Sequence, residues 1–495
     1  MSIPTDILLK AYRLMCTAKA MADTYEANRQ VCKYVHSTSR GHEAIQLATA
    51  FNLLPQDYVS PYYRDESIML GLGFSPYQLM LQLLAKKDDP FTGGREYYNH
   101  PNFRGNDKPT IIHQSSATGM QAIPTTGVAQ GIQYLEKRGL KYEKDKPVTI
   151  CSFGDSSITE GEVSEAFSFA ALHQLPIIYL VQDNDWGISV TGSEARAMNA
   201  FEYAAGFKGL ERLQCDGSDF IASYETMQAA FNFVRTERKP ILVHAKVPLL
   251  GHHTSGVRKE FYRTKEELQE QSISDPIIKL RKLLLEKSIA EFELIALNEN
   301  AKNIVNKAFS KAQIAEDPSP NDVENHIFAD TLIKEECGER NPINGEKILM
   351  VDAALYAIKE IMEQYPEAIL VIPESTTFPN NLDLGIIRKR SGVENLSPFT
   401  KSAFLFTITS INFGESIGSS WPSPSVKIKM SLADGTLFAP WLLNITALSD
   451  FRRSSNAKIA PVALADPCPV FFKCLRIAKL RLLLPRKSNA ISAVE

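Results

Sequence analysis

Two apolar segments near the middle of the chain each end in a side chain that can offer an oxygen ligand. Residues 148–153 lead into Asp155, and residues 177–181 lead towards Asn184. Short apolar runs are typical of buried strands in a parallel sheet, and the sequence between them predicts a crossover helix beginning near Glu160. The carboxyl ends of neighbouring parallel strands meet at one edge of the sheet, where open α/β sheets bind ligands. The pattern predicts an α/β fold with both ligands at that edge.

The chemistry of these strand ends predicts a metal–diphosphate site. Hard cations such as Mg²⁺ take oxygen ligands and share them with phosphate groups. The helix near Glu160 would point its amino end at the same edge, and helix amino ends attract anions. Asp155 and Asn184 are therefore candidate metal ligands. Taken alone, the pair also fits a tight turn followed by an unrelated strand-end amide.

Composition narrows the classes of protein to consider. A length of 495 residues suggests two to four domains. A net charge of −3 gives no reason to expect a nucleic-acid partner, and the seven scattered cysteines form no Cys-x-x-Cys pair that would predict zinc or a disulfide framework. We see no secretory signal, mitochondrial presequence or membrane-length apolar run. We therefore expect a cytoplasmic, bacterial protein.

The arrangement of apolar and polar residues predicts the order of elements. Residues ~7–100 favour helices, and residues ~105–250 alternate strands with helices, including a helix over 223–235 and a strand over 240–245. Such alternation is typical of a parallel sheet with helices on both faces. Residues ~264–315 again favour helices, and a polar linker follows.

Several stretches resemble, in order, landmarks of the E1 component of 2-oxo acid dehydrogenase complexes, specifically its α part. The segment from Gly154 to Asn184 is similar to the thiamin diphosphate motif, with Ser156 where the motif has its second glycine. The other matching stretches are Tyr12-Arg13-Leu14-Met15, Tyr62-Tyr63-Arg64-Asp65, Ser115-Ser116-Ala117-Thr118-Gly119 with Ile123-Pro124, Gly251-His252-His253-Thr254-Ser255, Asp275-Pro276-Ile277 and Pro318-Ser319-Pro320. The resemblance covers residues ~10–320 and implies a thiamin diphosphate-binding fold.

The resemblance implies thiamin diphosphate and Mg²⁺ as cofactors and assigns residues to them. Asp155, Asn184 and the backbone carbonyl of Trp186 would bind the metal. The implied cofactor-binding residues are Tyr63, Arg64, Ser116, Gly154, Asp155, Asn184, Trp186 and His253. Alternatives stay open for three of them: a surface ion pair of Arg64 with Asp65 or Glu66, a plain core position for Trp186, and an ordinary turn at Ser116.

His253 is the candidate catalytic residue, because it aligns with the family's cofactor-side histidine. It would stabilise negative charge or assist acyl transfer, with His252 supporting it. The family continues Ser-x-Ser-Asp, whereas this chain has Thr254-Ser255-Gly256-Val257. We therefore do not expect regulation by phosphorylation of this loop.

The domain prediction has four parts. Residues 1–320 form the E1α-like, diphosphate-side domain, and 321–344 form a linker. Residues 345–371 resemble the start of a fused E1β-like pyrimidine domain, a truncated second α/β unit with a helix near 348–358 and a strand near 365–371. Residues 372–495 match nothing we recognise, and we interpret them as a frame-shifted or disordered tail, or a divergent domain.

The resemblance implies an E1 component that decarboxylates a branched-chain 2-oxo acid and passes the acyl group to a lipoyl arm of an E2 acyltransferase. The activity would be of the 3-methyl-2-oxobutanoate dehydrogenase (2-methylpropanoyl-transferring) type. Pyruvate is the alternative substrate. Since the E1β glutamate that activates the cofactor has no counterpart here, the isolated chain would need an E1β-type chain or a homodimer partner. The remaining alternative is a catalytically incomplete, cofactor-binding subunit.

Overall fold

The computed structural model describes residues 3–112, 115, 117–139, 145–325 and 350–364, together with the backbone of three short strands between 410 and 444. The chain divides into two compact units, Met1–Phe328 and Ala329–Glu495. The first unit carries every candidate site residue.

A six-stranded parallel sheet forms the centre of the first unit. Its strand order is β2-β1-β3-β4-β8-β7, and all five neighbouring pairs are parallel. The strands are β1 (Tyr58–Ser60), β2 (Thr110–Ile111), β3 (Thr149–Gly154), β4 (Ile177–Asp183), β7 (Glu211–Asp216) and β8 (Ile241–Lys246). A small hairpin, β5 (Trp186–Gly187) with β6 (Val190–Thr191), follows β4.

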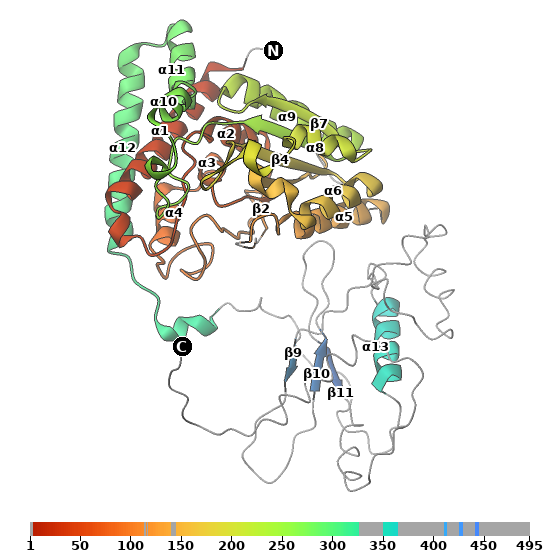
Figure 1. Cartoon of the computed structure of the whole chain (residues 1–495). Coiled ribbons are helices and arrows are strands. Elements are labelled where there is room, and N and C mark those ends of the chain that lie inside the picture. Colours follow the sequence, from red (N-terminus) through yellow and green to blue (C-terminus); the bar gives the residue numbers. More distant parts are fainter. Residues whose placement is uncertain are drawn as a thin grey trace, which may run out of the picture. The chain divides into compact units, whose positions relative to one another are not determined.

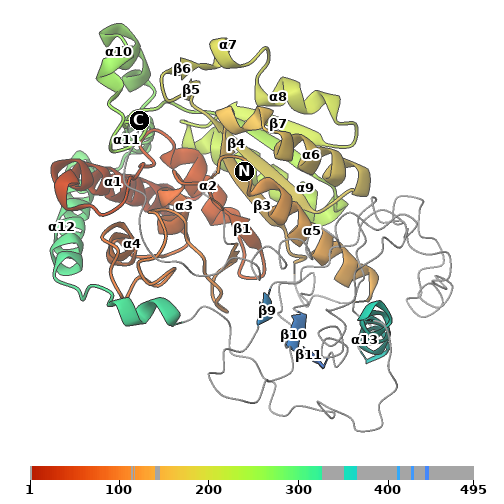
Figure 2. The same ribbon diagram turned by 60° about the horizontal axis from the view of Figure 1, so that its bottom comes forward.

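Side chains of the central strands alternate between two hydrophobic cores, because successive residues of a strand face opposite sides of the sheet. Ile150, Ile178 and Leu180 belong to the larger core with α1, α2 and α9, while Phe153 and Tyr179 belong to the other with α5 and α6. Figures 1 and 2 show α5 and α6 side by side. The predicted parallel sheet with helices on both faces is confirmed.

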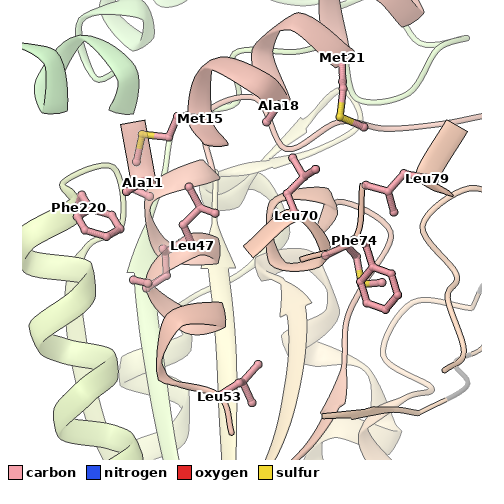
Figure 3. Close-up of a cluster of buried hydrophobic side chains, with 14 of the residues drawn as sticks. Ala11, Met15, Ala18, Met21, Leu47, Leu53, Leu70, Phe74, Leu79 and Phe220 are labelled. Carbon is pink, nitrogen blue, oxygen red and sulfur yellow. The ribbon is translucent and has the colours of Figure 1, made fainter. Parts of the chain in front are cut away.

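The larger core extends away from the sheet into a layer of helices. Figure 3 shows Met15 and Met21 of α1 close to Leu47 of α2 and Leu70 of α3, with Phe220 of α9 at one side. The helices of the unit are α1 (Thr5–Ala27), α2 (Glu43–Asn52), α3 (Glu66–Gly71), α4 (Pro76–Leu83), α5 (Ala122–Lys137), α6 (Gly161–His173), α7 (Gly192–Ala195), α8 (Ala200–Tyr203), α9 (Phe220–Glu237), α10 (Lys265–Ile273), α11 (Pro276–Glu286) and α12 (Glu291–Gln313).

The opening and closing helices of this unit pack together. Helix α1 contacts both α11 and α12, and Figure 1 shows the three side by side. The predicted helical region after residue 264 is confirmed by α10, α11 and α12. The predicted helical region 7–100 is confirmed for α1 to α4. Residues 84–100 form turns and loop instead of helix, and the sequence analysis missed β1.

In the second unit the structure describes one helix and a small antiparallel sheet. Helix α13 (Met350–Gln364) confirms the amphipathic helix predicted near 348–358. The strands β9 (Ser410–Asn412), β10 (Ser425–Ile428) and β11 (Trp441–Asn444) pair in the order β11-β10-β9. The strand predicted over 365–371 lies outside the described residues. The boundaries proposed for residues 321–344, 345–371 and 372–495 stay predictions.

Candidate functional site

Asp155 and Asn184 lie at the carboxyl ends of neighbouring strands. β3 and β4 pair in parallel with Gly154 opposite Gln182, so Asp155 follows one strand and Asn184 follows the other. Asp155 is 2% exposed and Asn184 is 4% exposed. Both side chains therefore offer oxygen atoms from inside the protein, at the edge where the sequence placed them.

The carboxylate of Asp155 is only partly compensated. Its Oδ2 is 2.7 Å from Nη1 of Arg196, a residue that the sequence analysis did not single out. The ion pair is not aligned as a hydrogen bond, and Oδ2 accepts none from the described residues. Burial and the nearby charge of Asp183 raise the pKa of Asp155, which Arg196 opposes. A buried oxygen with a spare lone pair suits a metal ligand.

Asn184 and Trp186 form a tight turn after β4. Oδ1 of Asn184 accepts a hydrogen bond from the backbone N–H of Trp186 at 3.0 Å. The Trp186 side chain is buried against the ring of Tyr262 and the guanidinium of Arg263, whose centre is 4.9 Å from the indole. The side chain of Trp186 thus has a packing role, and its backbone carbonyl stays the proposed metal ligand.

The helix after Asp155 begins where the sequence predicted, with Glu160 as its N-cap residue. A 3₁₀ turn over Asp155–Thr159 separates it from the strand. A Cβ atom placed on Gly119 would lie 3.1 Å from Cβ of Glu160. The amino end of α6 therefore adjoins the loop that contains Gly119, which the resemblance assigned to the cofactor.

Arg64 is buried, and it forms no salt bridge with a carboxylate among the described residues. The residue is 1% exposed, and its Nε and Nη1 atoms find no hydrogen-bond partner among the described residues. Its guanidinium carbon is 5.2 Å from the centre of the Tyr63 ring. The alternative of a surface ion pair with Asp65 or Glu66 is wrong, because Arg64 does not lie on the surface. A buried guanidinium with two free N–H groups suits a phosphate.

A small cavity lies between Tyr63 and the Gly119 loop. Its volume is about 10 Å³, and its walls include Tyr62, Tyr63, Ser115 and Ser157. Ser116 itself lies outside the described residues, so its proposed contact with the cofactor stays a prediction.

His253 lies beside Tyr63 and the β5–β6 hairpin. The two ring centres are 6.4 Å apart, and Nδ1 of His253 accepts a hydrogen bond from the backbone N–H of Ile188 at 3.3 Å. Burial, followed by the charge of Arg64, lowers the pKa of His253 to about 3. The imidazole is therefore neutral, and its Nε2–H is the donor available to a ligand.

His252 points elsewhere. Its ring nitrogens lie 3.9 Å from Glu26 and 3.7 Å from Glu260. No contact between the side chains of His252 and His253 is found among the described residues. The predicted support of His253 by His252 therefore stays a prediction. The loop is instead held from the other side, where the Ser37 hydroxyl donates to the backbone carbonyl of His253 at 2.7 Å.

The site also contains residues that the sequence analysis missed. His42, fully buried, lies between Gln182 and Asn184, with Nδ1 2.9 Å from Oε1 of Gln182 and Nε2 3.3 Å from Nδ2 of Asn184. The available signal was the polar run from Ser39 to Glu43 at the start of an apolar helix. Polar side chains in that position are costly to bury unless they make hydrogen bonds.

A larger cavity, about 1150 Å³ in volume, opens beyond Trp186 at the ends of β4, β7 and β8. Asn184, Trp186 and Arg263 contribute to its lining, but Arg64, Asp155 and His253 do not. The family resemblance predicts that Arg64, Asp155 and His253 converge on one pocket of cofactor size, and this cavity does not meet that prediction. Arg64 and His253 instead both lie against the ring of Tyr63, which packs on the ring of Tyr62.

The donor set fits a metal ion with a diphosphate. No cluster of three or more His, Cys, Asp or Glu side chains suited to a metal occurs in the part of the chain that the structure describes. A metal would therefore depend on the mixed set of one carboxylate, one amide and one carbonyl. Among the described residues, Oδ2 of Asp155 has only the ion pair with Arg196, and Nε and Nη1 of Arg64 have no hydrogen-bond partner. These are the buried polar atoms that such a ligand would satisfy.

Comparison with known proteins agrees with this geometry. The sequence profile of the family described as "Dehydrogenase E1 component" matches residues 12–321. The chain therefore belongs to the dehydrogenase E1 component family. It is an E1α-like chain of a 2-oxo acid dehydrogenase, and this family depends on thiamin diphosphate.

Relatives differ in the substrate that their names give. The chain is 30% identical to the 2-oxoisovalerate dehydrogenase subunit alpha of Bacillus subtilis, over 59% of this chain and 85% of that protein. It is 31% identical to the pyruvate dehydrogenase E1 component subunit alpha of Mycoplasma genitalium, over 58% and 74%. It is 28% identical to the mitochondrial 2-oxoisovalerate dehydrogenase subunit alpha 1 of Arabidopsis thaliana, over 56% of each. In addition, no helix among the described residues is long and apolar enough to cross a membrane.

Proposed function

We propose that residues 1–320 bind the diphosphate and the metal of Mg²⁺–thiamin diphosphate, for decarboxylation of a branched-chain 2-oxo acid and acyl transfer to a lipoyl group. The observation that carries the proposal is the buried Arg64 guanidinium, two of whose nitrogens have no hydrogen-bond partner in the part of the chain that the structure describes. A positive group in that state is costly unless an anion compensates it.

Each proposed ligand has a role that follows from its position. Asp155, the Asn184 amide and the Trp186 carbonyl would hold Mg²⁺, and Arg64 with Tyr63 would bind a phosphate. Ser116 and Gly154 would contribute backbone next to the cofactor. When bound, the cofactor supplies the carbanion chemistry that removes CO₂ from the 2-oxo acid.

His253 is the proposed catalytic residue. Its neutral ring can donate Nε2–H to negative charge on the substrate carboxylate or a phosphate. The hydrogen bond from Ile188 N–H to Nδ1 fixes this tautomer and the ring orientation.

The proposed partners are an E1β-type chain, or a second copy of this chain, and a lipoyl-bearing E2. Branched-chain substrates are the first choice, because the Bacillus relative named for 2-oxoisovalerate aligns over 85% of its length. Pyruvate is the second candidate, favoured by the pyruvate dehydrogenase relative at 31% identity.

The test has two stages. Calorimetry with thiamin diphosphate and Mg²⁺ should show binding to the full chain and no metal-dependent binding to Asp155→Ala. Decarboxylation of 2-oxoisovalerate and pyruvate is then compared with and without an added E1β-type chain. Absence of cofactor binding refutes the proposal, whereas binding without turnover in any mixture supports the incomplete-subunit alternative.

A further inference from the structure

A chain of buried side chains connects Asp65 to the proposed metal ligand Asn184. Gln182 Nε2 is 2.6 Å from Oδ1 of Asp65, and Gln182 Oε1 is 2.9 Å from Nδ1 of His42. Nε2 of His42 is 3.3 Å from Nδ2 of Asn184. All four residues are at most 4% exposed, so these groups depend on one another for hydrogen bonds.

The direction of the first hydrogen bonds is fixed by groups that cannot reverse. The backbone N–H of Ser67 donates to Oε1 of Gln46 at 3.1 Å, and the carbonyl of Arg64 accepts from Nε2 of the same amide at 3.0 Å. Nε2 of Gln46 is therefore the NH₂ group, and it donates to Oε1 of Gln182 at 2.9 Å. Nε2 of Gln182 then donates to Asp65.

This direction determines the tautomer of His42. Because Oε1 of Gln182 is an acceptor, the proton of the neutral imidazole must lie on Nδ1, and Nε2 must carry a lone pair. The hydroxyl of Tyr62 also approaches Nδ1, but at the longer distance of 3.4 Å. Nε2 then accepts from the NH₂ group of Asn184.

The orientation of the Asn184 amide follows. Its nitrogen faces His42 and its oxygen faces the backbone N–H of Trp186, which can only donate. The carbonyl oxygen keeps a second lone pair for another ligand. We propose that His42 is a positioning residue that holds the Asn184 amide with its oxygen directed to the metal; this inference rests on the function proposed above.

Two isosteric variants separate this role from general packing. His42→Gln can place an oxygen where Nε2 lies and so retain the contact with Asn184. His42→Asn can place an NH₂ group where Nδ1 lies, which retains the contact with Gln182 and loses the one with Asn184. The probe is Mn²⁺ with saturating thiamin diphosphate, and free Mn²⁺ is measured by electron paramagnetic resonance.

We expect His42→Asn to weaken Mn²⁺ binding by ~10–100-fold, because loss of a partner of a metal ligand usually has an effect of this size. We expect the Mn²⁺ affinity of His42→Gln to stay within about threefold of that of the unmodified protein. Equal affinities for both variants, with Asp155→Ala unable to bind, would overturn the role of His42 alone. An unmodified protein that binds no Mn²⁺, or Asp155→Ala that binds normally, would overturn the proposed function and this inference together.

A second measurement needs no variant. Long-range ¹H–¹⁵N correlation spectra of the histidine-labelled protein report which nitrogen of each ring is protonated. We expect Nδ1 of His42 to be protonated and Nε2 to be bare. The opposite tautomer would refute the assigned direction of the hydrogen bonds.

Discussion

Replacement of Arg64 by methionine should stabilise the protein without cofactor and impair cofactor binding. Methionine has a similar length and needs no hydrogen bonds. Each buried, unpaired donor costs ~1–3 kcal/mol, and Arg64 has two such atoms, Nε and Nη1. Loss of the contact with the Tyr63 ring removes ~0.5–2 kcal/mol of stabilisation. The two effects leave a net gain of ~0–5.5 kcal/mol, so we expect the free energy of unfolding of the cofactor-free protein to rise by about 3 kcal/mol, the middle of that range.

Cofactor binding should change in the opposite direction. Two hydrogen bonds from a charged group to a phosphate contribute ~1.5–3 kcal/mol each, so Arg64→Met should weaken thiamin diphosphate binding by ~10²–10⁴-fold. Urea unfolding without ligand gives the first quantity, and calorimetry with Mg²⁺ and thiamin diphosphate gives the second. Arg64→Lys is the control, since it keeps the charge but not the planar, two-point geometry, and we expect intermediate affinity. A less stable Arg64→Met protein, or one with unchanged affinity, would refute the reasoning.

Three further predictions concern other buried polar groups. Asp155→Ala should lose Mg²⁺-dependent cofactor binding while keeping its far-UV circular dichroism; an unchanged calorimetric affinity would contradict the metal assignment. His253→Ala should lower turnover with a partner chain and lipoyl acceptor by ~10²–10⁴-fold, with little change in melting temperature because the residue is only half-buried; normal turnover, or unfolding, would count against its catalytic role. Burial raises the pKa of Glu66 from 4.5 to about 8. Between these pH values the folded protein keeps the proton that the unfolded chain has lost, so the free energy of unfolding falls as pH rises from 4.5 through 8. Glu66→Gln should remove that fall, so its free energy of unfolding should gain up to ~5 kcal/mol relative to the unmodified protein between pH 4.5 and 8.5. Urea unfolding of both proteins across this range measures the difference. If the two pH profiles run parallel, Glu66 is ionised in the folded state and the prediction is wrong.

The sequence predicted the centre of the sheet because its strands are continuous apolar runs. β3, β4 and β8 are buried on both faces, so they read as mainly apolar segments between polar turns. β1 was missed because only three residues, Tyr58–Ser60, form it, and its pairing with β3 is a tertiary contact. Such short strands leave no periodicity to detect.

From the residues alone, the candidate site was predicted only where consecutive strands of the chain are neighbours in the sheet. The positions of Asp155 and Asn184 follow from adjacent strand ends. The contact of Asn184 with His42 joins residues 142 positions apart, and no local pattern in either segment predicts it. The sequence also could not predict that Arg64 is buried without hydrogen bonds to two of its nitrogens among the described residues. An arginine beside two acidic residues is equally consistent with an exposed ion pair.

The packing of α1 against α12 has a consequence for synthesis of the chain. A ribosome adds about 5–20 residues per second, so roughly 300 residues separate the emergence of α1 from that of its partner by about 15–60 s. During this interval the apolar face of α1 can pack on α2 and α3 but lacks α12. That face comprises Leu8, Ala11, Tyr12, Met15, Ala18 and Met21. Nascent chains and fragments that end before Glu291 therefore leave apolar side chains of α1 without part of their native contacts, and we expect them to bind chaperones that recognise exposed apolar segments.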